Sequence, residues 1–177
     1  MTQPFTHDPS RDAALVAAAR HGDRQAFGLL YVNYARMVHG ILLARVPPGE
    51  VDDLVQDVFL QAMRRLSSLR EDAAFGGWLA MIARNRAHDF HRRQPETAKL
   101  DEDLAARHPG GAEGAAVLAA IRELPETYRE TLTLRLVEGM TGPEIAARTG
   151  LTPGSVRVNL HRGMEQLRAR LGKGNRP

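Results

Sequence analysis

Residues 51–66 read VDDLVQDVFLQAMRRL, a stretch in which apolar side chains recur every three or four residues. The apolar positions are Val51, Leu54, Val55, Val58, Phe59, Ala62, Met63 and Leu66. On a helix with 3.6 residues per turn they form one stripe, whereas a half-buried strand needs an apolar residue at every second position. The stretch therefore predicts an amphipathic helix that packs into a core along this stripe.

The same helical spacing continues on both sides of this stretch. Asp23 is suited to cap a helix over residues 27–42, which the sequence Pro-Pro-Gly at 47–49 ends. After a hydrophilic stretch at 67–72, the pattern resumes over residues 75–90. No segment shows the alternation or the Val/Ile-rich runs of a strand. The sequence therefore predicts an all-α fold.

Residues 94–116 divide the chain into two helical parts. This segment, QPETAKLDEDLAARHPGGAEGAA, has no apolar stripe and is rich in Pro, Gly and acidic residues. We predict a helical domain over 1–93, a flexible acidic linker over 94–116 and a second helical domain over 117–177. Their formal net charges are +2, −3 and +4, so two basic domains flank an acidic linker. Of 24 basic residues 22 are Arg, which suits phosphates and base edges, although an Arg-rich genome explains it equally well.

Length and composition exclude several classes of protein. With 177 residues, the chain is too short for a large barrel or a doubly wound enzyme. Without cysteine it has no disulfide, zinc knuckle or thiol nucleophile. The polar N-terminus has no signal-like apolar region, and apolar runs such as 13–19 are too short to span a membrane. We therefore expect a soluble cytoplasmic protein without membrane insertion.

The strongest local motif is a helix-turn-helix over residues 142–164. Gly150 supplies the left-handed turn, Leu151 fills the corner, and Val156 and Leu160 anchor the second helix. Six basic residues and one acidic residue follow Gly150, so the last helix suits contact with phosphates, with its N-terminal residues at base edges. An ordinary helical hairpin with a solvated basic face remains the alternative.

Two segments of the first domain also suggest binding. Over residues 75–93, Trp78 precedes several polar and basic side chains, a pattern suited to stacking on unpaired bases, although Trp78 taken alone is better explained as a core residue. The helix at 50–66 begins with four acidic residues and carries Leu60 beyond them. These acids either complement the helix dipole or form a patch that docks on a basic protein surface.

Together these segments resemble the extracytoplasmic-function (ECF) sigma factors, the smallest members of the bacterial sigma-70 superfamily. DDLVQDVFLQAMRRL at 52–66, followed by FGGWLAMIARNRAHDFHRR at 75–93, is similar to region 2 of that family. The segment at 123–171, which begins ELPETYRETLTLRLVEG, is similar to region 4. The resemblance implies a region 2 bundle and a region 4 helix-turn-helix, which bind core RNA polymerase and direct promoter-specific initiation.

The resemblance also assigns roles to individual residues. Binding of core polymerase falls to Asp52, Asp53, Gln56, Asp57 and Leu60. Melting and binding of the minus-10 element falls to the loop at 67–77 and to Trp78, Arg84, Asn85, His88, Asp89, Arg92 and Arg93. Recognition of the minus-35 element falls to Ser155, Arg157, Val158, Asn159 and Arg162. The acidic linker would run through polymerase channels otherwise occupied by nucleic acid, and a cognate anti-sigma factor would control the protein.

Departures from the family pattern concern the last helix. Asn159 stands where the family usually has Arg, and Gly163-Met164 replaces the common Ala-Arg, which removes two usual phosphate contacts. One rival hypothesis is a stand-alone dimeric helix-turn-helix regulator, which leaves the first domain unexplained. Another is a metal-dependent enzyme built on His88 and Asp89, but a helix separates these side chains by about 100°. We expect no catalytic residue, metal or cofactor.

Overall fold

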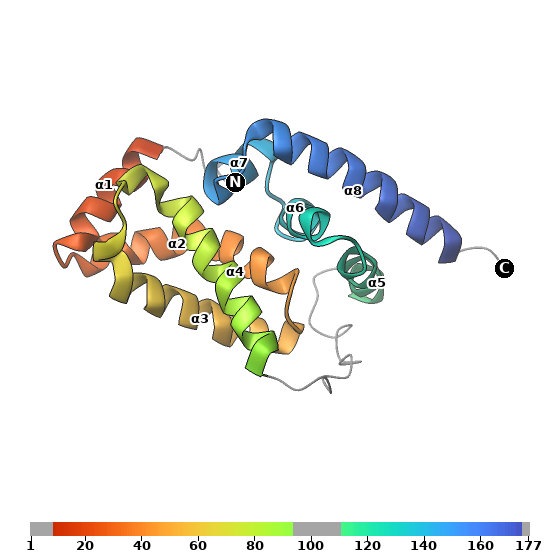
Figure 1. Cartoon of the computed structure of the whole chain (residues 1–177), viewed down its shortest axis with the longest axis horizontal. Coiled ribbons are helices and arrows are strands. Elements are labelled where there is room, and N and C mark those ends of the chain that lie inside the picture. The colour runs from red at the N-terminus through yellow and green to blue at the C-terminus, as the bar shows by residue number, and fades with distance from the viewer. Residues whose placement is uncertain (1–8, 94–110, 175–177) are drawn as a thin grey trace.

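The computed structural model describes residues 9–93 and 111–174, and in these ranges it contains only helices and their connections (Figure 1). The N-terminal half consists of α1 (Pro9–Arg20), α2 (Arg24–Leu43), α3 (Pro48–Arg65) and α4 (Phe75–Arg93). The C-terminal half consists of α5 (Gly111–Arg122), α6 (Glu126–Leu136), α7 (Gly142–Thr149) and α8 (Pro153–Gly174). The all-α prediction is therefore confirmed, although helix α1 had not been predicted.

Helix ends follow the local signals in the sequence. Asp23 caps α2, because its carboxylate accepts hydrogen bonds from the backbone N–H groups of Gln25 and Ala26 at 2.9 and 3.0 Å. Pro48 opens α3, at a position where its missing N–H costs no helical hydrogen bond. α2 therefore begins where Asp23 predicted it, and the Pro-Pro pair, which was predicted to end this helix, lies after its last residue Leu43 and also begins α3.

Helix α2 forms the centre of the N-terminal half and packs against α1, α3, α4 and α6. Its length and its mean hydropathy of 1.2 would also suffice for a membrane span, which the sequence reading of the run at 13–19 overlooked. Half of the apolar window is buried inside the protein, where Leu30, Met37 and Ile41 are fully enclosed. The apolar surface of α2 therefore serves the core.

The predicted stripe of α3 is buried with one exception. Val51, Val58 and Ala62 are no more than 1 % exposed, but Met63 is 50 % exposed. Met63 lies at the edge of the stripe, next to the fully buried Ala62. The prediction of Met63 as a core residue is wrong, because seven other apolar residues already fill the contact with α2 and α4.

A smaller core joins α5, α6 and α8 through Ile121, Leu124, Leu132 and Leu167. Gly163 of α8 is buried against α6, where a Cβ atom would lie 3.0 Å from Leu132 Cδ1. Glycine at this position therefore lets the two helices approach closely, which gives Gly163 a packing role.

The C-terminal half begins earlier than predicted. Helix α5 starts at Gly111, so the part of the predicted linker at 111–116 is helical. Its sequence GAEGAA contains three alanines, which favour a helix once Val117 and Leu118 provide a face that packs. The rest of the predicted flexible linker, 94–110, lies outside the described residues.

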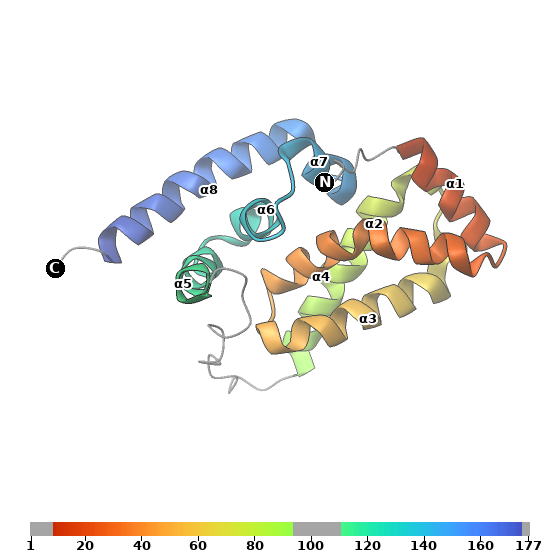
Figure 2. The ribbon, with the colours of Figure 1, turned by 180° about the vertical axis from the view of Figure 1, so that it is seen from behind.

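The two halves pack directly against each other (Figures 1 and 2). Leu134, Met140, Ile145 and Val156 of the C-terminal half belong to the same buried cluster as the core of the N-terminal half. Gly76 and Gly77 at the start of α4 face α7 and the turn after it. A Cβ on Gly77 would lie 3.4 Å from Gly150 Cα, so here the two backbones come together. In the views of Figures 1 and 2, α8 runs along the outside of this assembly.

Candidate nucleic-acid interfaces

Helix α3 presents most of the predicted polymerase-binding side chains to solvent. Asp52, Asp53, Gln56 and Leu60 are exposed. Asp57 is engaged by Arg86 of α4 through an ion pair and hydrogen bond, with about half of its side chain still exposed. The resulting face is acidic and has an apolar residue at its far end, a composition suited to a basic protein surface that also offers apolar contact.

An open groove of about 550 Å³ lies beside this face. It is lined by side chains that include Tyr31, Arg36, His39, Asp52, Gln56 and Glu138. His39 Nδ1 lies 2.6 Å from Glu138 Oε1, so a residue of the C-terminal half closes one side of the groove. The hydrogen bond with Glu138 raises the pKa of His39, and the charges of Glu138 and Asp52 add to this against the effect of burial.

Helix α4 divides the predicted minus-10 residues between different faces, because successive residues are rotated by about 100°. The exposed residues among them are Asn85, His88, Arg92 and Arg93. Met81, which was not predicted, is 51 % exposed and shares the face of Asn85 and His88. Asp89 is half-buried and pairs with Arg92 at 3.0 Å. An exposed polar and basic strip therefore follows one side of α4.

Trp78 lies at the edge of this strip and is half-buried. Its ring centroid is 5.9 Å from that of Phe75, and the ring packs against the core of the N-terminal half. Asn85 follows two turns later on the same side of the helix. Trp78 therefore combines a core contact with partial exposure beside the predicted nucleic-acid face.

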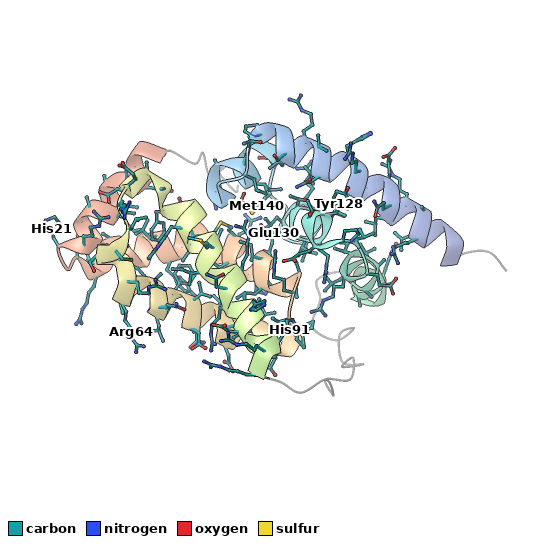
Figure 3. All side chains as sticks on the ribbon, in the orientation of Figure 1. His21, Arg64, His91, Tyr128, Glu130 and Met140 are labelled. Carbon is teal, nitrogen blue, oxygen red and sulfur yellow. The ribbon has the colours of Figure 1, made fainter. Side chains whose placement is uncertain are left out.

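Arg84 lies one turn before His88 and flanks this strip, but its guanidinium points toward the C-terminal half. Its Nη2 donates to Glu130 Oε1 at 2.7 Å and its Nε donates to Oε2 at 3.0 Å. Arg45, which follows α2, donates to the same Oε2 at 2.7 Å and also pairs with Glu126. Glu130 is only 4 % exposed, and Figure 3 shows it at the junction between the halves.

The ionisation of Glu130 and Arg84 reflects this pairing. Burial raises the pKa of Glu130, but the Arg84 hydrogen bond and the two nearby guanidinium charges outweigh it, so the pKa is lowered overall. The hydrogen bond to Glu130 raises the pKa of Arg84 against the effect of burial. Glu130 is therefore held as a carboxylate between two cations.

The loop before α4 is anchored by a residue that sequence reasoning missed. Arg20 of α1 pairs with Asp72 at 3.0 Å and donates hydrogen bonds to the carbonyl oxygens of Leu66 and Leu69. These contacts fix the two short 3-10 turns, Leu66–Ser68 and Asp72–Ala74, that lead into α4. In the sequence, Arg20 is marked only by its position at the end of an apolar run. That position indicates a basic residue at a helix C-terminus, but not a contact with the loop before α4.

The predicted helix-turn-helix is formed by α7 and α8. Thr141 and Glu144 make a capping box at the start of α7, and Gly150 ends this helix with φ of +76°. Thr152 then caps α8, because its hydroxyl accepts a hydrogen bond from Ser155 N–H at 3.1 Å. Val156 and Leu167 are buried along the inner stripe of α8. The local geometry of this motif therefore follows the sequence prediction.

The outer face of α8 carries most of the predicted minus-35 residues. Ser155, Arg157, Val158 and Arg162 are exposed, and within residues 9–93 and 111–174 neither Arg157 nor Arg162 forms a side-chain hydrogen bond or ion pair. Asn159 differs, because it is half-buried and lines a cavity of about 260 Å³ between the halves. Arg45, Arg84 and Glu130 line the same cavity, so in this arrangement Asn159 faces α4 and α6.

Arg148 of α7 is a second residue that the sequence analysis missed. It is 8 % exposed, its guanidinium lies 5.9 Å from the centre of the Tyr34 ring, and it donates to the Asn33 carbonyl oxygen. Tyr34 in turn donates to Asp12 at 2.7 Å. Arg148 therefore ties the helix-turn-helix to α2, although no local pattern distinguishes it from the exposed arginines.

Comparison with known proteins identifies the family. The family model for Sigma-70 region 2 matches residues 30–96, and the model for Sigma-70, region 4 matches residues 114–167. The ECF RNA polymerase sigma-E factor of Escherichia coli strain K12 is 34 % identical over 177 aligned residues, covering 88 % of this chain and 92 % of that protein. The chain is an ECF sigma factor of the sigma-70 family.

Solved structures agree with this assignment. CnrH, solved in complex with the cytosolic domain of CnrY, matches with a TM-score of 0.67 and 30 % identity, over 92 % of this chain and 98 % of that one. The sigma factor RpoE of Bartonella quintana, solved with the anti-sigma factor NepR, shares the fold with a TM-score of 0.57 at 24 % identity, over 84 % and 96 % of the two chains.

The two rival hypotheses lose their basis in these findings. Region 2 accounts for the N-terminal half, which a stand-alone helix-turn-helix regulator left unexplained. Sigma factors are initiation factors, which as a family are not enzymes. Within residues 9–93 and 111–174, no three His, Asp or Glu side chains are grouped to hold a metal ion.

Proposed function

We propose that this ECF sigma factor uses three separate surfaces during transcription initiation. The acidic face of α3, with Asp52, Asp53, Gln56 and Leu60, docks on core RNA polymerase. The exposed strip of α4 binds the non-template strand of the minus-10 element, and the outer face of α8 reads the minus-35 element. The protein acts in the cytoplasm as a specificity subunit without catalytic residues of its own.

The observation that carries this proposal is the distribution of exposed charge over the three helices. α3 exposes acids beside Leu60, whereas the strip of α4 exposes amide, imidazole and guanidinium groups next to Trp78. α8, the second helix of the helix-turn-helix, exposes Arg157 and Arg162. In this motif the second helix is the one that enters a major groove. Each surface therefore has the chemistry of a different partner: protein, single strand and duplex.

Run-off transcription with purified core polymerase on genomic fragments tests the proposal. We expect promoter-specific transcripts only when the full chain is added to the core enzyme. Footprinting of the free protein provides the control, because a specificity subunit should leave little protection without polymerase. Absence of specific transcripts, or strong symmetric protection by the free protein, would overturn the proposal.

We also propose an anti-sigma factor as a partner. The similar protein CnrH was solved with the cytosolic domain of CnrY bound, which shows that this fold accommodates a second protein chain. Helix α2 exposes the apolar side chains Leu29 at 47 % and Val32 at 63 %, and it also lines the groove beside α3 through Tyr31, so it offers a surface for such a chain. Co-purification of the chain with a genomically linked protein that suppresses run-off transcription would support this partner.

A further inference from the structure

Glu130 is the point at which both halves of the molecule share one buried charge. Its carboxylate lies on α6, whereas the two guanidinium groups that bind it belong to the N-terminal half. Both Arg45 and Arg84 donate to the same oxygen, Oε2, at 2.7 and 3.0 Å. Two guanidinium groups that converge on one oxygen form the arrangement that also binds phosphate.

Both acidic partners described for these arginines lie on α6. Arg45 pairs with Glu126 and Glu130, and Arg84 pairs with Glu130. Within the N-terminal half, the Arg45 side chain donates to the Ile41 carbonyl oxygen, which carries no net charge. Moving α6 away would therefore leave two neighbouring cations without their counter-ions. An anion that takes the place of the Glu130 carboxylate would stabilise the form of the protein in which the two halves are separated.

Binding to a promoter favours such a separation, if the proposed function is correct. The minus-10 and minus-35 elements lie about 25 base pairs apart, or about 85 Å at 3.4 Å per base pair. In the closed arrangement, however, the start of α4 touches the turn of the helix-turn-helix at Gly77 and Gly150. Contact between these backbones holds the two halves together, so simultaneous binding of both elements favours their separation.

We propose that Arg45 and Arg84 form a phosphate-binding pair for the promoter strand, and that Glu130 occupies this pair when the halves are closed. The inference rests on the proposed function and adds Arg45 to its DNA-binding residues. Glu130 thereby withholds Arg84 from DNA until the halves separate. Because a DNA phosphate and Glu130 compete for the same cations, DNA binding to the pair and closure of the halves oppose each other.

The test measures binding of the full chain to a mixed-sequence single-stranded oligonucleotide of twelve nucleotides by fluorescence anisotropy. Glu130→Gln should raise the affinity about fivefold or more, because it removes the one carboxylate that both arginines share and leaves Arg45 only its pair with the exposed Glu126. Glu123→Gln is the matched control, because Glu123 makes an exposed ion pair with Arg170 inside the C-terminal half. Equal affinities of the two variants would overturn the proposal.

Arg45 is tested in the Glu130→Gln protein. Adding Arg45→Gln should reverse the gain in affinity and reduce the slope of log K against log salt by about 0.7, the value for one lost phosphate contact on a single strand. Arg64→Gln, at an exposed position on α3 (Figure 3), should leave the slope nearly unchanged. An unchanged slope after loss of Arg45 would remove it from the DNA-binding residues and overturn the pair.

A distance measurement keeps the proposal testable if Glu130→Gln does not fold. The chain has no cysteine, so Gln25→Cys and Gln166→Cys provide two exposed labelling sites, one on each half. Energy transfer between the labels should fall when the oligonucleotide is added, and Arg45→Gln should weaken this response more than Arg64→Gln. A constant signal, or equal responses of these variants, would refute the competition.

The outcomes separate this inference from the proposed function. A protein that supports promoter-specific transcription, but whose Glu130→Gln and Glu123→Gln variants bind the oligonucleotide equally, refutes only the phosphate-binding pair. If the protein fails in transcription but shows the Glu130 and Arg45 effects, Arg45 and Arg84 still form an anion-binding pair. In that case the pair is no longer assigned to the promoter strand.

Discussion

Replacement of Gly76 by alanine should disturb the contact between the two halves. Gly76 is the second residue of α4 and is buried beneath α7. A Cβ atom there would lie 2.5 Å from the Arg148 carbonyl oxygen and 3.0 Å from Tyr34 Cε1. The first distance is far below van der Waals contact, so either α4 or α7 must move.

The magnitude follows from how little the neighbouring atoms can yield. The Arg148 carbonyl belongs to the backbone of α7, and the Tyr34 ring is 3 % exposed and held by its hydrogen bond to Asp12. Overpacking of this kind costs about 1 to 3 kcal/mol, whereas the gain in helix propensity from Gly to Ala is at most about 1 kcal/mol. We therefore expect Gly76→Ala to lower the free energy of unfolding by about 1 to 2 kcal/mol.

Urea unfolding, followed by circular dichroism and by the fluorescence of Trp78, measures this change. Trp78 is the only tryptophan of the chain and lies two residues from Gly76, so its emission reports on the same junction. Gly28→Ala is the matched control, because Gly28 lies inside α2 with no atom within 4 Å of an added Cβ, and it should gain up to about 1 kcal/mol. A Gly76→Ala protein as stable as Gly28→Ala would refute the close packing of the halves.

Three further predictions concern charge. The raised pKa of His39 means that its pairing with Glu138 stabilises the folded protein below the unfolded pKa near 6.5, and that this stabilisation is lost as pH rises through the higher folded pKa. His39→Gln should therefore flatten the decrease of the urea midpoint as pH rises above 6.5. Asp52→Asn combined with Asp53→Asn should weaken binding to core polymerase in a pull-down while minus-35 duplex binding is retained, and equal loss of both would contradict separate surfaces. Arg157→Gln should weaken minus-35 binding by about 1 to 3 kcal/mol, selectively at one base pair if Arg157 reads a base and uniformly across sequences if it contacts phosphate; unchanged affinity would exclude Arg157 from the interface.

The helices and their ends were predictable because their causes are local. The side chain of Asp23 caps the helix that starts next to it, and Gly150 adopts the left-handed turn that its missing Cβ permits. The outward face of α8 followed from its inner stripe, so the exposure of Arg157 and Arg162 was expected from periodicity alone. α1 escaped prediction because its run of alanines has no clear apolar stripe, although Val16 is fully buried.

The positions of Arg84 and Asn159 could not be predicted in the same way. Arg84 was assigned to the minus-10 residues and does flank His88 on α4, but its guanidinium binds Glu130 of α6. Asn159 was grouped with the outer face of α8, yet it lines the cavity between the halves. Periodicity identifies the face on which a side chain lies, but it does not identify the partner of that face.

The sequence by itself determined the helical fold, the caps and turns, the helix-turn-helix and the acidic, basic and apolar faces of the helices. These features depend on interactions within a few residues of each other, and so they can be derived from spacing and side-chain chemistry. Only the tertiary structure decided that Arg45 and Arg84 share the carboxylate of Glu130, which lies 85 and 46 residues away along the chain. Such contacts depend on how complete helices pack against each other. Gly76 and Gly77 allow α4 to approach α7 closely, and the spacing of residues in the sequence does not predict this approach.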